Sequence, residues 1–479
     1  MFSFTRDPHS SIWSRSLESR LSIVFCFLTG ACASNPDSAR PSTSAYSPNF
    51  RASEVETPAD ELTTDEATPK GLDGLIRLAL ANNPNIRAAR AQLQASRDIA
   101  PQVASLPDPE LTGSYFIEEV ETRVGPQEWS LGIRQRFPSS DALEASRSAA
   151  EIRTQADRAQ LGAVMQAVVL EVKLAWYELF YLERAILSFN EDRDRLQSVE
   201  EVIRRDYATG SAAYTTLIRA QVELGQSENK LAGLRDQRVP AIARLNVVLH
   251  RSIQSPVSSP NELQVPNKLL STEELEQRMA DLNPELQRIQ FEKRAAKADQ
   301  NRADHEGSPD YTLGLQYINT GGARSANVPG NGDDPLVATF SIGLPVRRAR
   351  LDAASRAARA RTRMMSANVE SKLDQLRSEL AQAHFLARDA ERQINLYQSS
   401  LLPRAKQSFD AIEADFRSGQ SDFNELIDAK RVLLDFRLAL QRALTDRAIA
   451  HARLEFLVGA SATQFSSNSP ADQTAGSQK

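Results

Sequence analysis

The chain has 479 residues, of which 41% are hydrophobic, and its 57 basic and 62 acidic side chains give a net charge of −5. This weakly acidic balance argues against nucleic acid as a partner, because nucleic-acid-binding proteins carry a basic excess. With two cysteines and five scattered histidines, neither a disulfide framework nor a Cys/His metal site is expected, and no cofactor is implied. The sequence also lacks the run of about 20 apolar residues that a membrane-spanning helix needs.

The N-terminus has the features of a targeting segment, which we assign to residues 1–32. An apolar run over residues 21–31 follows a stretch with three arginines, and it is too short to span a bilayer. Cys32 closes the sequence TGAC, which resembles the lipidation motif of bacterial lipoproteins, and the absence of an aspartate after it favours the outer membrane. The alternative is cleavage within the sequence ACA, which removes Cys32 and leaves a secreted chain without a lipid.

The body of the chain contains one pattern twice. The sequence DYATG, which ends at Gly210, recurs as DFRSG, which ends at Gly419, and an Asn-Pro pair at Asn83 recurs at Asn283. Such self-similarity indicates an internal duplication. The expected segments are a targeting segment (1–32), a polar tether (33–70), a first repeat (71–250), a linker (251–270), a second repeat (271–460) and a disordered polar tail (461–479).

Each repeat is expected to open with one helix, over residues 72–102 in the first copy and 273–304 in the second. Two short strands follow, then a very long helix, a glycine turn and a returning helix. In the long helices apolar residues recur every 3.5 residues, as in the seam of a coiled coil. The first long helix, residues 140–206, would extend for about 100 Å at 1.5 Å per residue. Pro403 removes a backbone donor from the second long helix, so a bend is expected there.

The short strands alternate between apolar and polar side chains. Segments 110–118 and 129–137 in the first copy match 311–317 and 336–344 in the second, with the same apolar parity. Four strands are too few to close a barrel around a lumen, and lipid does not tolerate open sheet edges, so several subunits would have to combine. The pattern favours a transmembrane barrel with its apolar side chains outside, and edge hairpins of a soluble protein are the alternative. The residues expected to face lipid are Leu131, Ile133, Phe340 and Ile342.

The repeated glycine turns, the Asn-Pro pairs and the sequence LLPRA, which begins at Leu401, make the chain resemble the bacterial outer membrane efflux proteins. It is similar to the TolC-like outer membrane factors, especially the lipoprotein members of heavy-metal and drug pumps, over residues 71–460. The resemblance implies a mainly α fold with a small β part. Duplicated long antiparallel helices would form an α-barrel tunnel, and four β-strands per subunit would contribute to a trimeric 12-stranded transmembrane β-barrel.

The resemblance also implies a function, partners and a location. The expected function is that of an outer membrane channel, the exit duct of a tripartite efflux pump. It would act as a homotrimer with a periplasmic adaptor and a proton-driven inner-membrane pump, lipid-anchored in the outer membrane with its tunnel in the periplasm. The alternative, a periplasmic adaptor or coiled-coil scaffold, accounts for the heptads but not for the duplicated strand parity. The sequence has no nucleophile–base constellation and no phosphate-binding glycine loop, so no enzyme is expected, and it does not identify the cargo.

The same resemblance places candidate pore residues at the periplasmic tip, near Gly210 and Gly419. Glu425 and Asp428 match two acidic positions that form rings at the constriction, and their i, i+3 spacing puts both on one helix face. An ordinary solvated charge pair is the alternative. Arg219 would neutralise Asp428 if their helices meet. The neighbouring gate positions are Thr216, Arg219 and Phe416.

A run of arginines within residues 347–363 opens a helix directly after the last predicted strand. These side chains could contact lipid phosphates, or they could line the tunnel. A solvated helix face is the third interpretation, and the pattern favours it over the other two.

Overall fold

The computed structural model describes residues 71–459, apart from residues 259, 261, 264, 266–268 and 326. The predicted targeting segment with Cys32, the tether and the polar tail lie outside the described residues. The first repeat contains α2 (Gly71–Asn82), α3 (Pro84–Ala104), β1 (Glu110–Thr122), β2 (Gly125–Phe137), α4 (Ser140–Ala208) and α5 (Tyr214–Val248). The second contains α6 (Thr272–Leu282), α7 (Pro284–His305), β3 (Tyr311–Thr320), β4 (Leu336–Ile342), α8 (Arg348–Leu396), a π-helical turn (Tyr397–Leu401), α9 (Leu402–Arg417) and α10 (Phe423–Val458). The shared order confirms a duplicated, mainly helical fold with a small sheet.

The structure corrects the expectation of one continuous opening helix in each repeat, because an asparagine divides it into two. α2 and α3 meet at Asn83, and α6 and α7 meet at Asn283. The side-chain oxygen of each asparagine accepts a backbone N–H from the first turn of the following helix, at 2.9 Å and 2.8 Å. Proline fits the first position after this cap, where its missing N–H needs no partner. Each side-chain amide also donates to the end of its own repeat, at the carbonyls of Val248 and Leu457.

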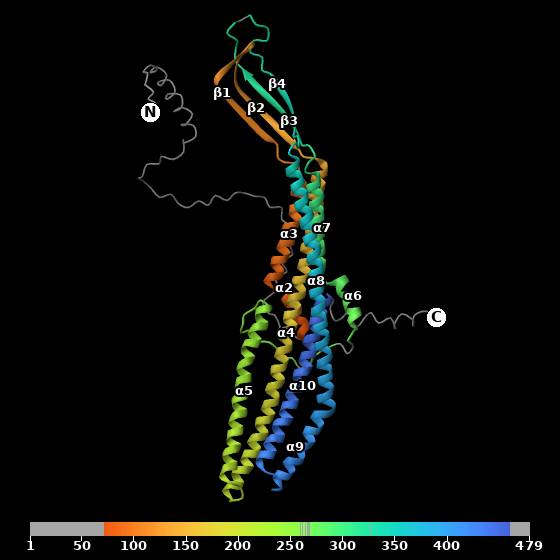
Figure 1. Ribbon diagram of the computed structural model, residues 1–479. Helices are drawn as coiled ribbons and strands as arrows, with labels where there is room; N and C mark the ends of the chain where they lie inside the picture. Colours follow the sequence, from red (N-terminus) through yellow and green to blue (C-terminus); the bar gives the residue numbers. More distant parts are fainter. Residues whose placement is uncertain are drawn as a thin grey trace, which may run out of the picture. The chain divides into compact units, whose positions relative to one another are not determined.

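The strands of both repeats form one antiparallel sheet in the order β1-β2-β3-β4, at one end of the long helices (Figure 1). The two hairpins join through β2 and β3, where Leu131 pairs with Tyr317 and Ile133 pairs with Leu315. Residues that pair across antiparallel strands lie on the same face of the sheet, so the apolar residues of both repeats share one face. This register confirms the predicted apolar parity of the strands.

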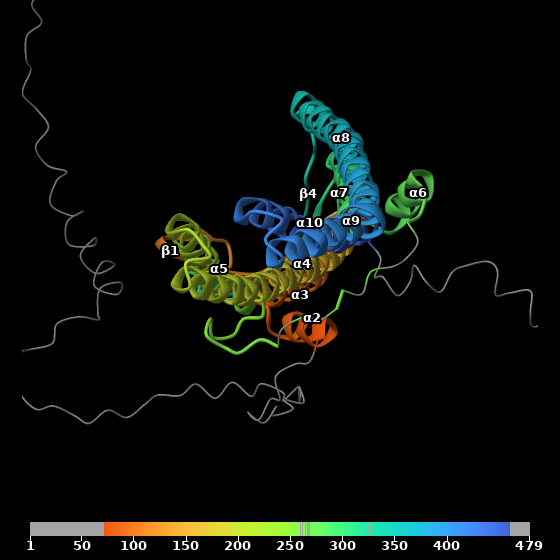
Figure 2. The same ribbon diagram turned by 90° about the horizontal axis from the view of Figure 1, so that it is seen from below.

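The helices form a curved layer with α2 and α6 on its convex side (Figure 2). α4 is the central element and packs against α3, α5, α7 and α10. The predicted coiled-coil positions are buried, since Val168, Val172, Leu376 and Leu380 are at most 3% exposed. Burial of this apolar stripe, more than helix propensity, stabilises such helices. Within the described residues, no helix is both long enough and apolar enough to cross a membrane.

The second long helix is interrupted just before Pro403, as the sequence predicted. α8 ends at Leu396, and the π-helical turn leads from it into α9. Here the backbone N–H of Leu402 donates to the carbonyl of Tyr397, five residues back. Because proline has no N–H and crowds the preceding turn, this wider turn absorbs the disruption and the helix changes direction there (Figure 1).

Candidate functional site: the sheet and the hairpin ends

The sheet has its apolar face exposed, the reverse of an ordinary soluble sheet. On β1, the side chains of Leu111, Tyr115 and Ile117 are between 74% and 77% exposed. A contiguous exposed apolar face of this kind marks a surface that contacts lipid or another protein. The residues predicted to face lipid all lie on this exposed face: Leu131, Ile133, Phe340 and Ile342.

The opposite face of the sheet carries hydrogen-bonding and charged side chains. Ser130 is only 3% exposed and accepts a hydrogen bond from Nε2 of Gln316 at 2.8 Å. Arg134 forms an ion pair with Glu110 at 3.0 Å. The polar side chains therefore interact with one another on the face turned away from the apolar one, as in the lumen of a membrane barrel.

Aromatic side chains gather at both ends of the apolar face. Trp129 and Tyr317 lie in contact at the end far from the helices, with their ring centroids 5.8 Å apart. Tyr311 stacks on Phe340 at the end near the helices, with a centroid distance of 6.1 Å. Paired aromatic girdles of this kind mark the two interfaces of a membrane-embedded sheet, because their rings prefer the boundary between hydrocarbon and headgroups.

The outer edges of β1 and β4 have no strand partner among the described residues. An exposed edge leaves backbone N–H and C=O groups unsatisfied, which is costly in lipid and promotes pairing with another chain in water. The sheet therefore needs further strands on both sides, and a second copy of the chain offers the matching edge.

At the other end of the helices, the two repeats finish in the same turn. Gly210 and Gly419 both have φ = 78°, a conformation that residues with a Cβ rarely adopt. The next residue in each turn donates its backbone N–H five positions back, to Asp206 at 2.7 Å and to Asp415 at 2.8 Å. This pattern closes the C-terminus of a helix by satisfying its free carbonyl groups. The left-handed backbone conformation of the turn therefore explains why both repeats have glycine at this position.

The predicted acidic pair lies in the first two turns of α10, with Glu425 in the first. Glu425 and Asp428 are both exposed, and the side chain of Asp428 is 76% accessible. Asp422 caps the helix by accepting the backbone N–H of Glu425 at 2.9 Å. This contact is the main reason why the pKa of Asp422 is lowered. Phe416 packs against Phe423 across the turn, with 6.3 Å between their ring centroids.

The expected contact between Arg219 and Asp428 is replaced by another. Nη1 of Arg219 donates to Oδ1 of Asn424 at 2.9 Å, so the two hairpins do meet at this level. Asp428 instead lies 3.9 Å from Arg431 on its own helix. Thr216 is half-buried on α5. Arg219 of the first hairpin thus contacts the second hairpin through the amide of Asn424, and the carboxylates of Glu425 and Asp428 stay exposed.

Sequence reasoning missed a buried ion pair that joins the repeats. Nζ of Lys430 on α10 lies 3.1 Å from Asp192 on α4, and their side chains are only 11% and 7% exposed. Ser227 of α5 donates to the same carboxylate at 3.0 Å. Nearby, Arg431 pairs with Glu223, 208 residues earlier in the chain. The heptad pattern carries no signal for such contacts, because they depend on how distant helices align.

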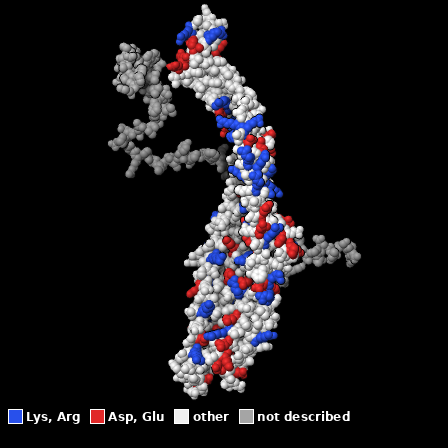
Figure 3. Space-filling model, viewed as in Figure 1, with Lys and Arg blue, Asp and Glu red and all other residues white. Residues whose placement is uncertain are grey.

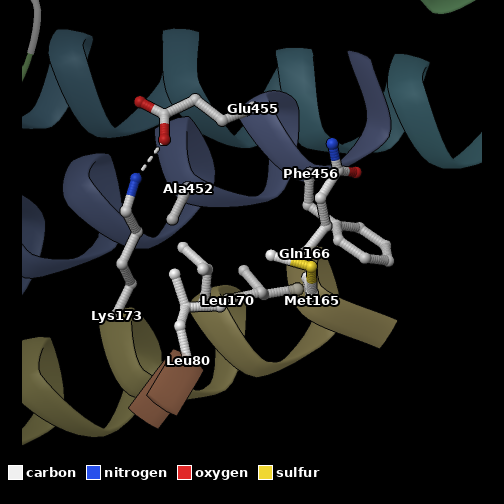
Figure 4. Close-up of a pocket in the computed structure, with 9 residues that line it drawn as sticks. Leu80, Met165, Gln166, Leu170, Lys173, Ala452, Glu455 and Phe456 are labelled. Carbon is white, nitrogen blue, oxygen red and sulfur yellow. Dashed lines mark hydrogen bonds and ion pairs between the residues drawn. The ribbon is translucent and has the colours of Figure 1, made fainter. Parts of the chain in front are cut away.

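A cavity of about 210 Å³ lies between α4 and α10, with Leu80 of α2 in its wall (Figure 4). Its lining is mostly apolar, and Lys173 and Glu455 form an ion pair at one side. Burial, followed by the charge of Glu455, raises the pKa of nearby Tyr177, which keeps this phenol protonated. Among the described residues, no three His, Cys, Asp or Glu side chains cluster so as to hold a metal ion.

Comparisons with known structures show where this arrangement occurs elsewhere. The chain is similar to CusC, described as forming a transmembrane channel, with 19% identity and a TM-score of 0.69 over 81% of this chain and 92% of that one. It is similar to the outer-membrane channel OprN, with 18% identity and a TM-score of 0.70 over 90% and 99% of the two chains. It also resembles the outer membrane protein VceC of Vibrio cholerae, with 19% identity and a TM-score of 0.67 over 81% and 96%.

At sequence identities of 18% and 19%, these structures show that the fold is shared. Membership of a protein family is shown by a separate comparison with family models. No curated protein sequence matches the chain. The family described as outer membrane efflux protein matches residues 75–249 and 275–460, which together span most of the chain and both repeats. The chain therefore belongs to the outer membrane efflux protein family.

Proposed function

We propose that three copies of this chain form the exit duct of a tripartite efflux pump in the outer membrane. The observation that carries the proposal is the sheet, which exposes its apolar face, gathers polar side chains on the opposite face and leaves both edges unpaired among the described residues. Pairing β4 of one copy with β1 of the next satisfies every edge, and three four-stranded sheets make a barrel of twelve strands. A coiled-coil scaffold or a periplasmic adaptor would leave the apolar face in water.

In this proposal the helices form a tunnel below the barrel, on the periplasmic side. Family membership supports a periplasmic adaptor and a proton-driven inner-membrane pump as partners, with the glycine turns at Gly210 and Gly419 as the docking end. Cys32 would carry the lipid that adds a second anchor. Mass spectrometry of the mature protein tests this anchor, since an unmodified N-terminus at Ser34 would contradict it.

We further propose that Glu425 and Asp428 form the constriction of the tunnel. Both carboxylates are exposed near the hairpin end, and within the described part of the chain only Asp428 has an ion-pair partner, at the long distance of 3.9 Å. Threefold repetition would bring six carboxylates around the axis and favour the passage of cations. Arg219, Thr216 and Phe416 are the proposed neighbours of this gate.

Insertion and conductance of the purified full-length chain test the proposed function. We expect a trimer by cross-linking and ion conductance in a planar bilayer.

Replacing Phe340 by Arg should impair membrane assembly by about 2–4 kcal/mol, because the charge would face lipid. Ser341→Arg, one residue along the same strand, is the matched control and should be tolerated, since Ser341 lies exposed on the polar face. Ser130 is unsuitable as the control, because it is buried and bonded to Gln316.

Equal tolerance of arginine at Phe340 and Ser341 would contradict a lipid-facing sheet. A water-soluble monomer that neither partitions into membranes nor conducts ions would overturn the proposed function as a whole.

A further inference from the structure

α8 begins shortly after β4 with a dense run of arginines, which we call the arginine stripe. All of them are exposed, and in the space-filling view basic side chains gather on the helices directly below the sheet (Figure 3). On the same side of the molecule the sheet is free of charged side chains except around its loop end, so the view shows its apolar face (Figure 3). The members of the stripe are Arg347, Arg348, Arg350, Arg356, Arg359, Arg361 and Arg363.

Most of the stripe lacks a partner within the described residues. Arg350 pairs with Glu306 at 2.7 Å, and Arg359 lies 3.6 Å from Asp304. The other five arginines make no ion pair or side-chain hydrogen bond with the part of the chain that the structure describes. Asp352 is the one acidic residue within the run, and it too has no ion-pair partner there. The stripe therefore carries a strong local excess of positive charge.

Helix stability does not explain this charge. The N-terminus of a helix carries a partial positive charge, so basic side chains in the first turn are unfavourable there. α8 has no acidic residue in its first turn and no side-chain cap. By contrast α4, α7 and α10 begin with Asp141, Glu285 and Glu425. α3, α5 and α9 also lack an acidic residue in their first turn, so α8 differs from the other helices in its density of arginines, three among residues 347–350.

The position of the stripe relative to the apolar face indicates its ligand. Beyond β4, Leu344 and Val346 extend the apolar surface and are 68% and 78% exposed. Arg347 follows at once, just past the aromatic end marked by Tyr311 and Phe340. The headgroup layer next to the hydrocarbon core is about 5–8 Å thick, and an arginine side chain can reach back into it. The start of the stripe, Arg347 and Arg348, thus lies at the depth of lipid phosphates, whereas Arg356 and Arg363 lie roughly 12 Å and 22 Å farther along α8 at about 1.5 Å per residue.

We propose that the start of the arginine stripe, at Arg347 and Arg348, binds the phosphate groups of anionic phospholipids in the periplasmic leaflet of the outer membrane. The proposal rests on the proposed function, because it requires the sheet to be in the membrane. A guanidinium can hold a phosphate through two parallel N–H···O bonds, which suits arginine better than lysine. A basic residue near an anionic membrane surface contributes about a fivefold gain in binding.

The test compares two double variants of the full-length chain. Arg347→Gln and Arg348→Gln together remove the two members at the start of the stripe that have no ion-pair partner among the described residues. The matched control removes the same charge on α9, through Arg404→Gln and Lys406→Gln, both at exposed positions without an ion pair among the described residues. Each protein is equilibrated in micelles containing phosphatidylglycerol and phosphatidylcholine, and the bound lipids are counted by native mass spectrometry.

We expect the unaltered chain and the control to retain phosphatidylglycerol preferentially, and the stripe variant to lose that preference by about fivefold per arginine. The preference should also weaken at high salt, because salt screens electrostatic attraction at a surface.

An unchanged preference in a variant that still forms trimers and conducts would overturn the lipid site alone. A changed ion selectivity with unchanged lipid binding would place the stripe in the tunnel, and loss of the trimer would place it against a neighbouring subunit. If the unaltered chain fails to insert, both the lipid site and the proposed function fall.

Discussion

The two helical hairpins of this protein end in the same turn but approach it differently. Gly210 and Gly419 share φ = 78° and the same backbone hydrogen bonds. The first hairpin reaches its turn through α4, an unbroken helix of 69 residues. The second reaches it through α8, the π-helical turn and α9, and so it bends.

The surfaces of the hairpins also differ after the turn. The first carries Thr216 and Arg219 at the positions where the second carries Glu425 and Asp428. A turn that needs a left-handed residue restricts its sequence, whereas exposed helix positions accept many side chains at little cost. The two copies therefore share the backbone of the turn and differ in the bend of the helix before it and in the charge of the helix after it.

The largest effect is expected from loss of the buried ion pair between Lys430 and Asp192, which joins the two hairpins. Lys430→Met leaves Asp192 buried without its cation, and the loss of one partner of a buried pair costs about 3–5 kcal/mol. We expect a large drop in the thermal unfolding midpoint of the purified protein. The double change Lys430→Met with Asp192→Leu should recover most of it, because an apolar pair needs no solvation. Lys406→Met, at an exposed position, is the control, and an equal loss there would contradict the role of the pair.

The two turns should respond equally to loss of their glycines. Gly210→Ala and Gly419→Ala should each cost about 1–2 kcal/mol, because a Cβ is strained at this φ. No neighbouring atom lies within 4 Å of the added Cβ at either position, so the cost is conformational. Gly225→Ala on α5, also without a close neighbour, should stabilise the protein by up to about 1 kcal/mol. Denaturant unfolding measures all three, and clearly unequal costs at the two turns would show that the hairpins do not share one backbone requirement.

The acidic positions test whether the second hairpin alone sets ion selectivity. Glu425→Gln with Asp428→Asn should reduce the preference for cations several-fold in planar-bilayer recordings, which corresponds to about 1 kcal/mol. Trimer assembly should be unchanged, since both residues are exposed. Glu228→Gln with Asp236→Asn removes the same charge from exposed positions on α5 and should leave selectivity unaltered. Unchanged selectivity in the first variant would return Glu425 and Asp428 to an ordinary solvated pair.

The smallest expected effect concerns the start of each returning helix. Asp422 caps α10, whereas Ala213 before α5 offers no side-chain cap. The pKa of Asp422 is lowered in the folded protein, so its stabilising effect is present above the ordinary aspartate pKa and is lost as pH falls through the lowered value. Asp422→Ala should therefore speed amide hydrogen exchange at the start of α10 at neutral pH, and less so in acid. Ala213→Asp should slow exchange at the start of α5, and no change there would show that the two helix starts are not equivalent.

Local pattern alone predicted much of this molecule. Strand parity around Leu131 and Phe340 follows from the period of two, and the buried seam at Val172 and Leu380 follows from the period of 3.5. The repeated turns follow from glycine, whose φ preference needs no distant contact. Even the missed breaks at the Asn-Pro pairs were readable, because asparagine before proline is a helix start signal.

The tertiary structure decided which polar groups of distant helices pair with one another. Asp192 meets Lys430, Arg219 meets Asn424 rather than Asp428, and the amide of Asn283 reaches the last turn of α10. Periodicity states which face of a helix is buried, but it does not state how far one helix slides along another. A shift of one turn, about 5.4 Å, changes every ion pair between the two helices and leaves the apolar seam intact. For that reason the sequence determined the elements and their faces, and only the packing of the helices determined their polar contacts.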